Sequence, residues 1–156
     1  MLIGKKIRIK TTPELEILFR KCVGVARFSY NLMISLNNSS QKFIKESDVR
    51  KYVTQLKKQD NYSWLKEVSA NIPKQAIKNC GKAYSDYFKK LRGKPKFKKK
   101  SNAKLSYKTN NHKQKSTIRI ENSKLILPKF KSGIKIVLHR QIDGLIKSAT
   151  IEKTPS

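Results

Sequence analysis

The chain has 156 residues, enough for one domain or two small ones, and 37 Lys and Arg residues against 10 Asp and Glu give it a net charge of +27. No stretch approaches the ~20 apolar residues of a membrane span, and the start turns basic before an apolar run typical of a signal peptide develops. This excludes a spanning membrane protein and favours a cytoplasmic one. Apolar residues recur along most of the length, which predicts a folded body rather than wholesale disorder.

The charge points to a polyanionic partner. Self-repulsion at +27 disfavours a compact state, and each Lys or Arg that neutralises a phosphate gains affinity by releasing a counterion. Nucleic acid is therefore expected. An anionic membrane is the rival, but the sequence has neither a basic amphipathic helix nor a lipidation site. Cys22 and Cys80 fall within helical apolar patterns and there is no CxxC pair, so we expect reduced core thiols and no metal or cofactor.

The amino-terminal half predicts a strand followed by three helices. Residues 3–10 end in an alternation of apolar and basic residues, typical of a half-buried strand. Thr12 and Pro13 then predict the N-cap and first position of a helix of about twenty residues. Ser47 and Asp48 open a second, shorter helix, and a third begins near Ser69 and stops at Gly93. The apolar stripe expected on the third helix comprises Ala76, Ile77, Cys80, Tyr84, Tyr87, Phe88 and Leu91. Trp64 and Leu65 are expected to pack into the junction between the helices.

A carboxylate-free, lysine-rich stretch separates Asp86 from Glu121. Its centre, residues 93–100, cannot form a regular helix, and a lone charge run of this kind is most simply a solvated linker. The interleaved aromatic residues Phe97 and Tyr107 favour contact instead, because rings among lysines can stack on bases.

The remaining residues predict five short strands, at 104–109, 117–121, 124–127, 133–138 and 145–152, separated by turn residues that include Asn122 and Ser123. One strand, three helices and five strands together predict an α+β fold, a small β-barrel-like module whose first strand returns to the sheet and into which the helices are inserted as a bundle.

Several motifs carry a family resemblance. The run Ala26-Arg27-Phe28-Ser29-Tyr30-Asn31 and the pattern from Ile72 to Phe88 are followed by Gly93-Lys94-Pro95-Lys96-Phe97-Lys98, then by Leu125-Ile126-Leu127-Pro128-Lys129 and the segment 144–151. These resemble the first helix, third helix, Gly-x-Pro-x-Phe-Lys loop and later strands of TnpB (OrfB) proteins, transposon-encoded RNA-guided nucleases related to the small type V CRISPR effectors. The resemblance covers nearly the whole chain.

The resemblance implies a wedge-like, oligonucleotide-binding-type barrel with an inserted helical recognition domain. It places the first barrel strand at 1–11, a helix-turn-helix-like recognition domain at 12–92, and the basic loop with the other barrel strands at 93–156. It implies partners as well, a guide RNA scaffold and double-stranded DNA carrying a short target-adjacent motif, in a prokaryotic, nucleoid-associated protein. The RuvC-like nuclease domain of the family is expected to be missing from this chain.

No catalytic residue is expected. Two-metal cleavage needs several carboxylates converging on ions about 4 Å apart, whereas the ten acids here are scattered singly or sit at helix starts. Glu14 and Glu16 suit a helix dipole, Asp48 a cap and Asp143 a turn.

Candidate binding residues fall into three groups. Asn71 and Gln75, four apart on one helix face, align with family positions that read the DNA motif; the alternative is that both are exposed without partners. Arg27 and Asn31 lie one turn apart off the apolar stripe and predict backbone contacts, a salt bridge or helix–helix hydrogen bond being the alternative. The other predicted backbone contacts are Lys74, Lys78, Lys94, Lys96, Lys98, Lys99, Lys100, Lys104, His139 and Arg140, and the predicted stacking residues are Phe97 and Tyr107. Core packing is expected for Tyr30 and Tyr87.

Two other functions fit parts of the sequence. A structural RNA-binding protein of ribosomal type would suit the size and pI of about 10.3, but leaves the Gly-x-Pro-x-Phe-Lys loop unexplained. A stand-alone helix-turn-helix DNA-binding protein would use the three helices, but leaves the basic β region unexplained.

Overall fold

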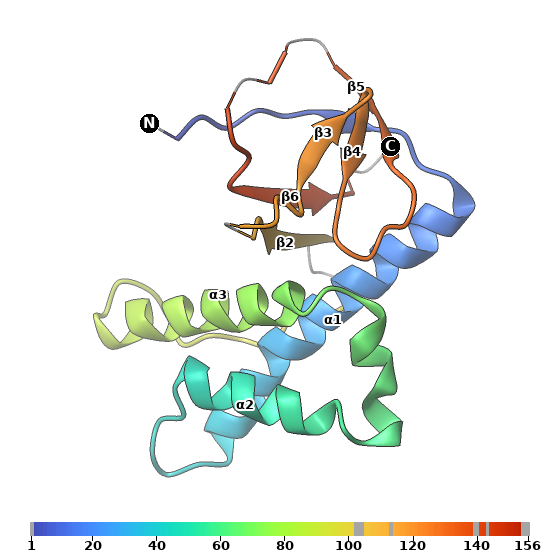
Figure 1. Ribbon diagram of the computed structural model, residues 1–156. Coiled ribbons are helices and arrows are strands. Elements are labelled where there is room, and N and C mark those ends of the chain that lie inside the picture. Colours follow the sequence, from blue (N-terminus) through green and yellow to red (C-terminus); the bar gives the residue numbers. More distant parts are fainter. Residues whose placement is uncertain (1, 102–104, 113, 139–140, 143, 154–156) are drawn as a thin grey trace.

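The computed structural model describes residues 2–101, 105–112, 114–138, 141–142 and 144–153. Its helices are α1 (Pro13–Asn38), α2 (Glu46–Leu56) and α3 (Asn71–Phe88), with the 3-10 segment η1 (Asp60–Glu67) between α2 and α3. The strands are β1 (Arg8–Ile9), β2 (Ser106–Asn110), β3 (Arg119–Glu121), β4 (Lys124–Ile126), β5 (Ile134–Val137) and β6 (Ser148–Glu152). Figure 1 shows a helical part and a small β part, with α1 running from one to the other. The mixed α and β composition is as predicted.

Helix α1 begins where the sequence predicts. The Thr12 hydroxyl accepts a hydrogen bond of 3.3 Å from the Leu15 backbone N–H, and Pro13 follows at the first helical position. Glu14 and Glu16 occupy the first turn, where the helix dipole favours negative charge. The helix is longer than predicted and ends at Asn38.

Helix α2 is not capped by Ser47 or Asp48. Its N-cap is Lys45, without a side-chain hydrogen bond, and Asp48 lies inside the first turn. The acids at this end, Glu46 and Asp48, therefore act on the helix dipole rather than as caps.

Helix α3 ends before Gly93, contrary to the prediction. The chain leaves the helix after Phe88, and Lys90 takes a positive φ of 62° just beyond the end. The predicted apolar stripe stops accordingly, because Leu91 is 73% exposed and Tyr87 lies at the surface rather than in the core. Upstream, Leu65 is fully buried as expected, whereas Trp64 remains partly exposed.

The strands form two small antiparallel sheets. One has the order β1-β5-β4-β3, so the first strand does return to the sheet, although it is only two residues long. The other pairs β2 with β6 over five residues. Asn122 and Ser123 join β3 to β4 with positive φ values of 52° and 61°, the conformation of a tight hairpin turn. Over the described residues the two sheets do not close into a barrel.

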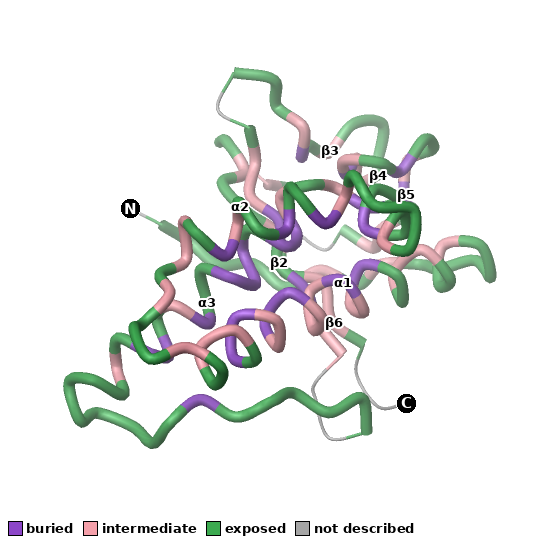
Figure 2. The backbone as a smooth tube through the Cα atoms, turned by 90° about the horizontal axis from the view of Figure 1, so that it is seen from below, coloured by how far each residue is buried: buried purple, intermediate pink, exposed green. Residues whose placement is uncertain are grey.

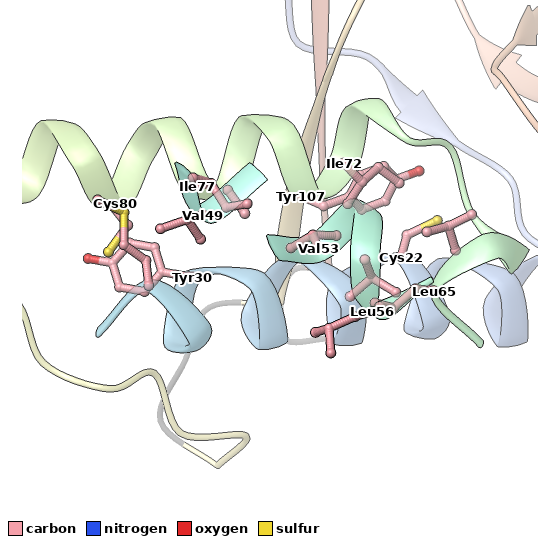
Figure 3. Close-up of a cluster of buried hydrophobic side chains, with 14 of the residues drawn as sticks. Cys22, Tyr30, Val49, Val53, Leu56, Leu65, Ile72, Ile77, Cys80 and Tyr107 are labelled. Carbon is pink, nitrogen blue, oxygen red and sulfur yellow. The ribbon is translucent and has the colours of Figure 1, made fainter. Parts of the chain in front are cut away.

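A single apolar core joins the helices to the sheets. Figure 3 shows Cys80 and Tyr30 at one end of the helical cluster, with Cys22 and Leu65 at the other. Tyr107 from β2 reaches the same cluster beside Ile72 of α3. Phe19 of α1 continues it toward the β part, with its ring centroid 5.1 Å from that of Phe130. Helix α1 is therefore the common support of both parts.

The two thiols give a test of this core. Cys22 is 1% exposed and Cys80 is fully buried, and burial raises their pKa values to about 11 and about 12. Because alkylation requires the thiolate, we expect neither thiol of the native protein to react with iodoacetamide near pH 8 on the timescale on which both react in guanidinium. Mass spectrometry counts the labels. Labelling of either cysteine in the native protein at the unfolded rate would contradict the packing.

Candidate nucleic-acid interface

The basic loop, residues 93–100, is attached to α1 by one side chain. Asn31 donates a hydrogen bond of 2.9 Å from Nδ2 to the Lys98 carbonyl, and its Oδ1 accepts one of 2.8 Å from the Lys98 N–H. The amide thus serves Lys98 as a neighbouring strand would, although 67 residues separate the two. Asn31 was predicted to contact nucleic acid directly. The structure shows instead that its amide holds the loop backbone, and a direct contact with nucleic acid stays a prediction.

Two further contacts hold the loop. The Lys98 ammonium lies 4.3 Å from the centroid of the Tyr30 ring, within cation–π distance. Burial lowers the pKa of Lys98 and raises that of the Tyr30 hydroxyl. Pro95 is buried while residues 89–94 and 96–101 are exposed, and Figure 2 shows this stretch as a long exposed tube with one buried point. The loop is therefore docked on the helices, unlike a solvated linker.

Docking leaves four lysines facing water. Lys94, Lys96, Lys99 and Lys100 are exposed, and none forms an ion pair or side-chain hydrogen bond within the described part of the chain. Phe97 among them is 50% exposed. An ordered backbone that presents unpaired ammonium groups and a free ring has the chemistry of a phosphate- and base-binding segment. These residues and Lys98 remain predicted contacts.

Tyr107 does not belong with Phe97. It is only 4% exposed, and its ring centroid lies 6.5 Å from that of Phe19. Its burial raises the pKa of its hydroxyl. A base could stack on this ring only if the core opened, so the predicted stacking role of Tyr107 is wrong.

The face of α3 that was predicted to read DNA is also occupied. Gln75 is 5% exposed, and the Asn71 Oδ1 accepts a hydrogen bond of 2.6 Å from the backbone N–H of Asn110 in β2. Asn71 therefore anchors β2 to α3. Gln75 is too buried to read a base edge, so that prediction is wrong, and Gln75 is not the exposed residue of the alternative either. Asn71 has a partner but is only half-buried, and base reading by Asn71 stays a prediction.

The solvent-facing side of α3 is cationic. Lys74 and Lys78, the predicted backbone contacts on this helix, are exposed, and Lys82 continues their row one turn further on. Lys82 was not among the predicted residues, although its spacing of four from Lys78 was the signal. On β2, Lys108 is exposed between the buried residues Tyr107 and Thr109. It was not predicted either.

Arg27 lies between two hollows. The smaller, about 160 Å³, is lined by Arg27, Asn79, Lys98 and Lys108 together with apolar residues of α1, α3 and β2. The larger, about 440 Å³, is lined by Lys21, Gly24, Val25, Arg27, Phe28, Asn31, Trp64 and Glu67, and we call it the Trp64 hollow. The Arg27 guanidinium is half-buried and makes no hydrogen bond or ion pair within the described residues. Its predicted contact with a phosphate stays a prediction.

Gly24 lines the Trp64 hollow from the middle of α1. Glycine inside a helix costs about 0.5–1 kcal/mol relative to alanine. Packing does not require it here, because a Cβ at this position would meet no atom within 4 Å. The Lys21 ammonium and Glu67 carboxylate pair at 3.0 Å on the lining of the same hollow.

Three predicted contacts, Lys104, His139 and Arg140, lie outside the described residues. In the described part of the chain no three His, Cys, Asp or Glu side chains are grouped so as to hold a metal ion. None of the described helices is both long and apolar enough to cross a membrane.

Comparison with known proteins supports one of the families considered above. Residues 1–42, which include β1 and all of α1, match the helix-turn-helix domain of the OrfB proteins of IS605 elements. The chain is also 25% identical over 154 residues to "Putative RNA-guided DNA endonuclease InsQ" of Escherichia coli (strain K12). The resemblance to the TnpB/OrfB family is confirmed.

The match to InsQ covers 96% of this chain but 37% of InsQ. The chain thus spans little more than a third of the length of this curated TnpB/OrfB relative. The helix-turn-helix match and this relative favour a transposon protein over the ribosomal-type alternative.

The Asn31 contact gives the next prediction. Asn31→Ala removes both hydrogen bonds to Lys98, which we expect to lower the free energy of unfolding by about 1–3 kcal/mol and to expose the basic loop to trypsin. Urea unfolding and the rate of tryptic cleavage after Lys96, Lys98, Lys99 and Lys100 measure the two effects.

Asn38→Ala is the matched control, since Asn38 is an exposed asparagine of the same helix without a side-chain hydrogen bond in the described residues. Equal loop cleavage in the Asn31 and Asn38 variants would mean that Asn31 does not hold the loop.

Proposed function

We propose that this chain binds nucleic acid through the basic loop and the adjoining surfaces of α1 and α3. The observation that carries the proposal is the ordered presentation of Lys94, Lys96, Lys99 and Lys100, unpaired and exposed on a backbone that Asn31 holds in place. A net charge of +27 supports it, because bound phosphates would neutralise positive charges that otherwise repel one another. The OrfB helix-turn-helix match supports it independently, since such domains bind nucleic acid.

The finer proposal concerns the ligand. We propose a guide RNA scaffold and a duplex with a target-adjacent motif, and the support is the family resemblance together with the name of InsQ as an RNA-guided DNA endonuclease. In this proposal the helices from residue 12 to 92 form the recognition domain, and the two sheets correspond to the wedge of the family. Sequencing of the RNA that co-purifies with the chain tests it: one structured RNA species is expected, whereas bulk ribosomal RNA would favour the ribosomal-type alternative.

Binding without cleavage completes the proposal. Four of the described carboxylates have local roles: Glu67 pairs with Lys21, Glu121 pairs with Arg119 at 3.0 Å, and Glu14 and Glu16 lie at a helix start. A duplex incubated with the RNA-loaded chain and Mg²⁺ should remain intact. Cutting that survives repurification and is abolished by mutating a named carboxylate would refute this part.

The salt dependence of binding tests the loop. Replacing Lys94, Lys96, Lys99 and Lys100 with Gln should flatten the slope of log affinity against log salt by roughly 0.7–0.9 for each phosphate that the loop no longer neutralises. Fluorescence anisotropy of a labelled oligonucleotide across a salt series gives the slope.

A second quadruple variant separates binding by the loop from the effect of net charge. Lys42, Lys51, Lys58 and Lys66 are also exposed lysines, and they lie outside the basic loop. Changing them to Gln removes the same charge and should alter the slope less. Equal slopes for the two quadruple variants would show that the loop has no special part in binding.

A further inference from the structure

The Trp64 hollow combines features that suit one unstacked nucleobase. Its volume of about 440 Å³ lies within the roughly 300–1,000 Å³ of small-ligand pockets. Trp64 is 37% exposed, and its Nε1–H donates a hydrogen bond of 3.1 Å to the Asn61 carbonyl, which fixes the ring. Phe28 lies edge-on to it, with the ring centroids 5.0 Å apart. Aromatic rings held in this way are the surfaces on which single-stranded bases stack.

The same hollow holds complementary polar groups. Arg27 offers a guanidinium without a partner in the described residues, which suits the phosphate of the bound nucleotide. Glu67 offers a carboxylate, which forms an ion pair of 3.0 Å with the Lys21 ammonium. A carboxylate accepts from the amino group of cytosine, whereas uracil carries a carbonyl oxygen at that position, which repels a carboxylate.

Gly24 supports a ligand in this hollow independently of the aromatic and charged side chains. A glycine in the middle of α1 weakens the helix, yet no neighbouring atom forbids a Cβ at this position. The absence of a side chain at Gly24 leaves open space in the lining of the Trp64 hollow. The residue is therefore explained by ligand space rather than by packing.

We propose that the Trp64 hollow binds a single unstacked, amino-bearing nucleobase, with its ring on Trp64, its phosphate at Arg27 and its amino group at Glu67, and that Gly24 provides the room for it. The proposal rests on nucleic-acid binding by the chain and adds a defined subsite to it. An unpaired stretch of RNA and a displaced DNA strand offer the same chemistry, and ribo- and deoxyribo-oligonucleotides distinguish them.

Trp64 is the only tryptophan of the chain, so its fluorescence reports on this hollow directly. Short oligocytidylate titrated into the whole chain at fixed salt should quench it, and oligouridylate should bind more weakly. Gly24→Ala should abolish the quenching and weaken binding roughly tenfold, as expected when one base can no longer stack. Its urea midpoint should not fall. Gly4→Ala is the control, since a Cβ at Gly4 also meets no atom within 4 Å.

The outcomes separate the two levels of the proposal. Binding of oligonucleotides without a change in Trp64 fluorescence, or with unchanged affinity in Gly24→Ala, would overturn the subsite and leave nucleic-acid binding intact. Equal affinity for oligocytidylate and oligouridylate would overturn the role of Glu67. Failure of every oligonucleotide and duplex to bind would overturn the proposed function itself. In the Gln variant of Lys94, Lys96, Lys99 and Lys100, oligocytidylate should need a higher concentration than in the wild type. If it still quenches Trp64 fluorescence fully at saturation, the result would support a subsite distinct from the loop.

Discussion

The pair of hydrogen bonds between the Asn31 amide and the Lys98 backbone is the interaction on which the cationic surface depends. A lysine-rich segment without such an attachment would spread into solvent, because its charges repel one another and it has little apolar surface to bury. The Lys98 ammonium over Tyr30 and the buried Pro95 add to the attachment. The Tyr-Asn end of the helix motif and the Pro-x-Phe-Lys part of the loop motif are thus the two sides of one contact. An ordered loop loses less conformational entropy when it meets a phosphate backbone, which raises its affinity without any new contact.

Asparagine side chains hold other connections of this fold in the same way. Asn37 bonds both the N–H and the carbonyl of Ile44 and so fixes the link between α1 and α2. Asn111 joins the Ile118 backbone to the Ile146 carbonyl, and Asn71 ties β2 to α3. Backbone groups in short, irregular connections lack the partners that helices and sheets supply, and an amide can serve a donor and an acceptor at once. A chain rich in short connections can therefore remain ordered while its lysines stay at the surface for a ligand.

The sequence predicted the parts of the fold that local chemistry determines. The sequence predicts the start of α1 at Thr12 and Pro13, and the turn at Asn122 and Ser123, because these residue types strongly favour helix starts and turns. The roles of the polar residues were harder to predict, for a different reason. Whether Asn31 is free depends on a loop 67 residues away, and Gln75 is buried because α1, α2 and β2 all pack on α3. The periodicity of apolar residues along one helix does not show how many other elements pack against that helix. For Tyr107 the signal was present, since it alternates with the exposed Lys108 and faces the core with Thr109. The Trp64 hollow could not be predicted, because it forms only where η1 packs beside α1.

The central claim is that Asn31 acts on nucleic-acid binding by ordering the basic loop. A double-mutant cycle tests it most directly. Affinity for one labelled oligonucleotide is measured at fixed salt for the wild type, for Asn31→Ala, for the Gln variant of Lys94, Lys96, Lys99 and Lys100, and for the combination. If Asn31 works by ordering those lysines, its removal should weaken binding in the wild type and have little further effect once the lysines are gone. Full additivity, with Asn31→Ala costing the same affinity in both backgrounds, would contradict the account.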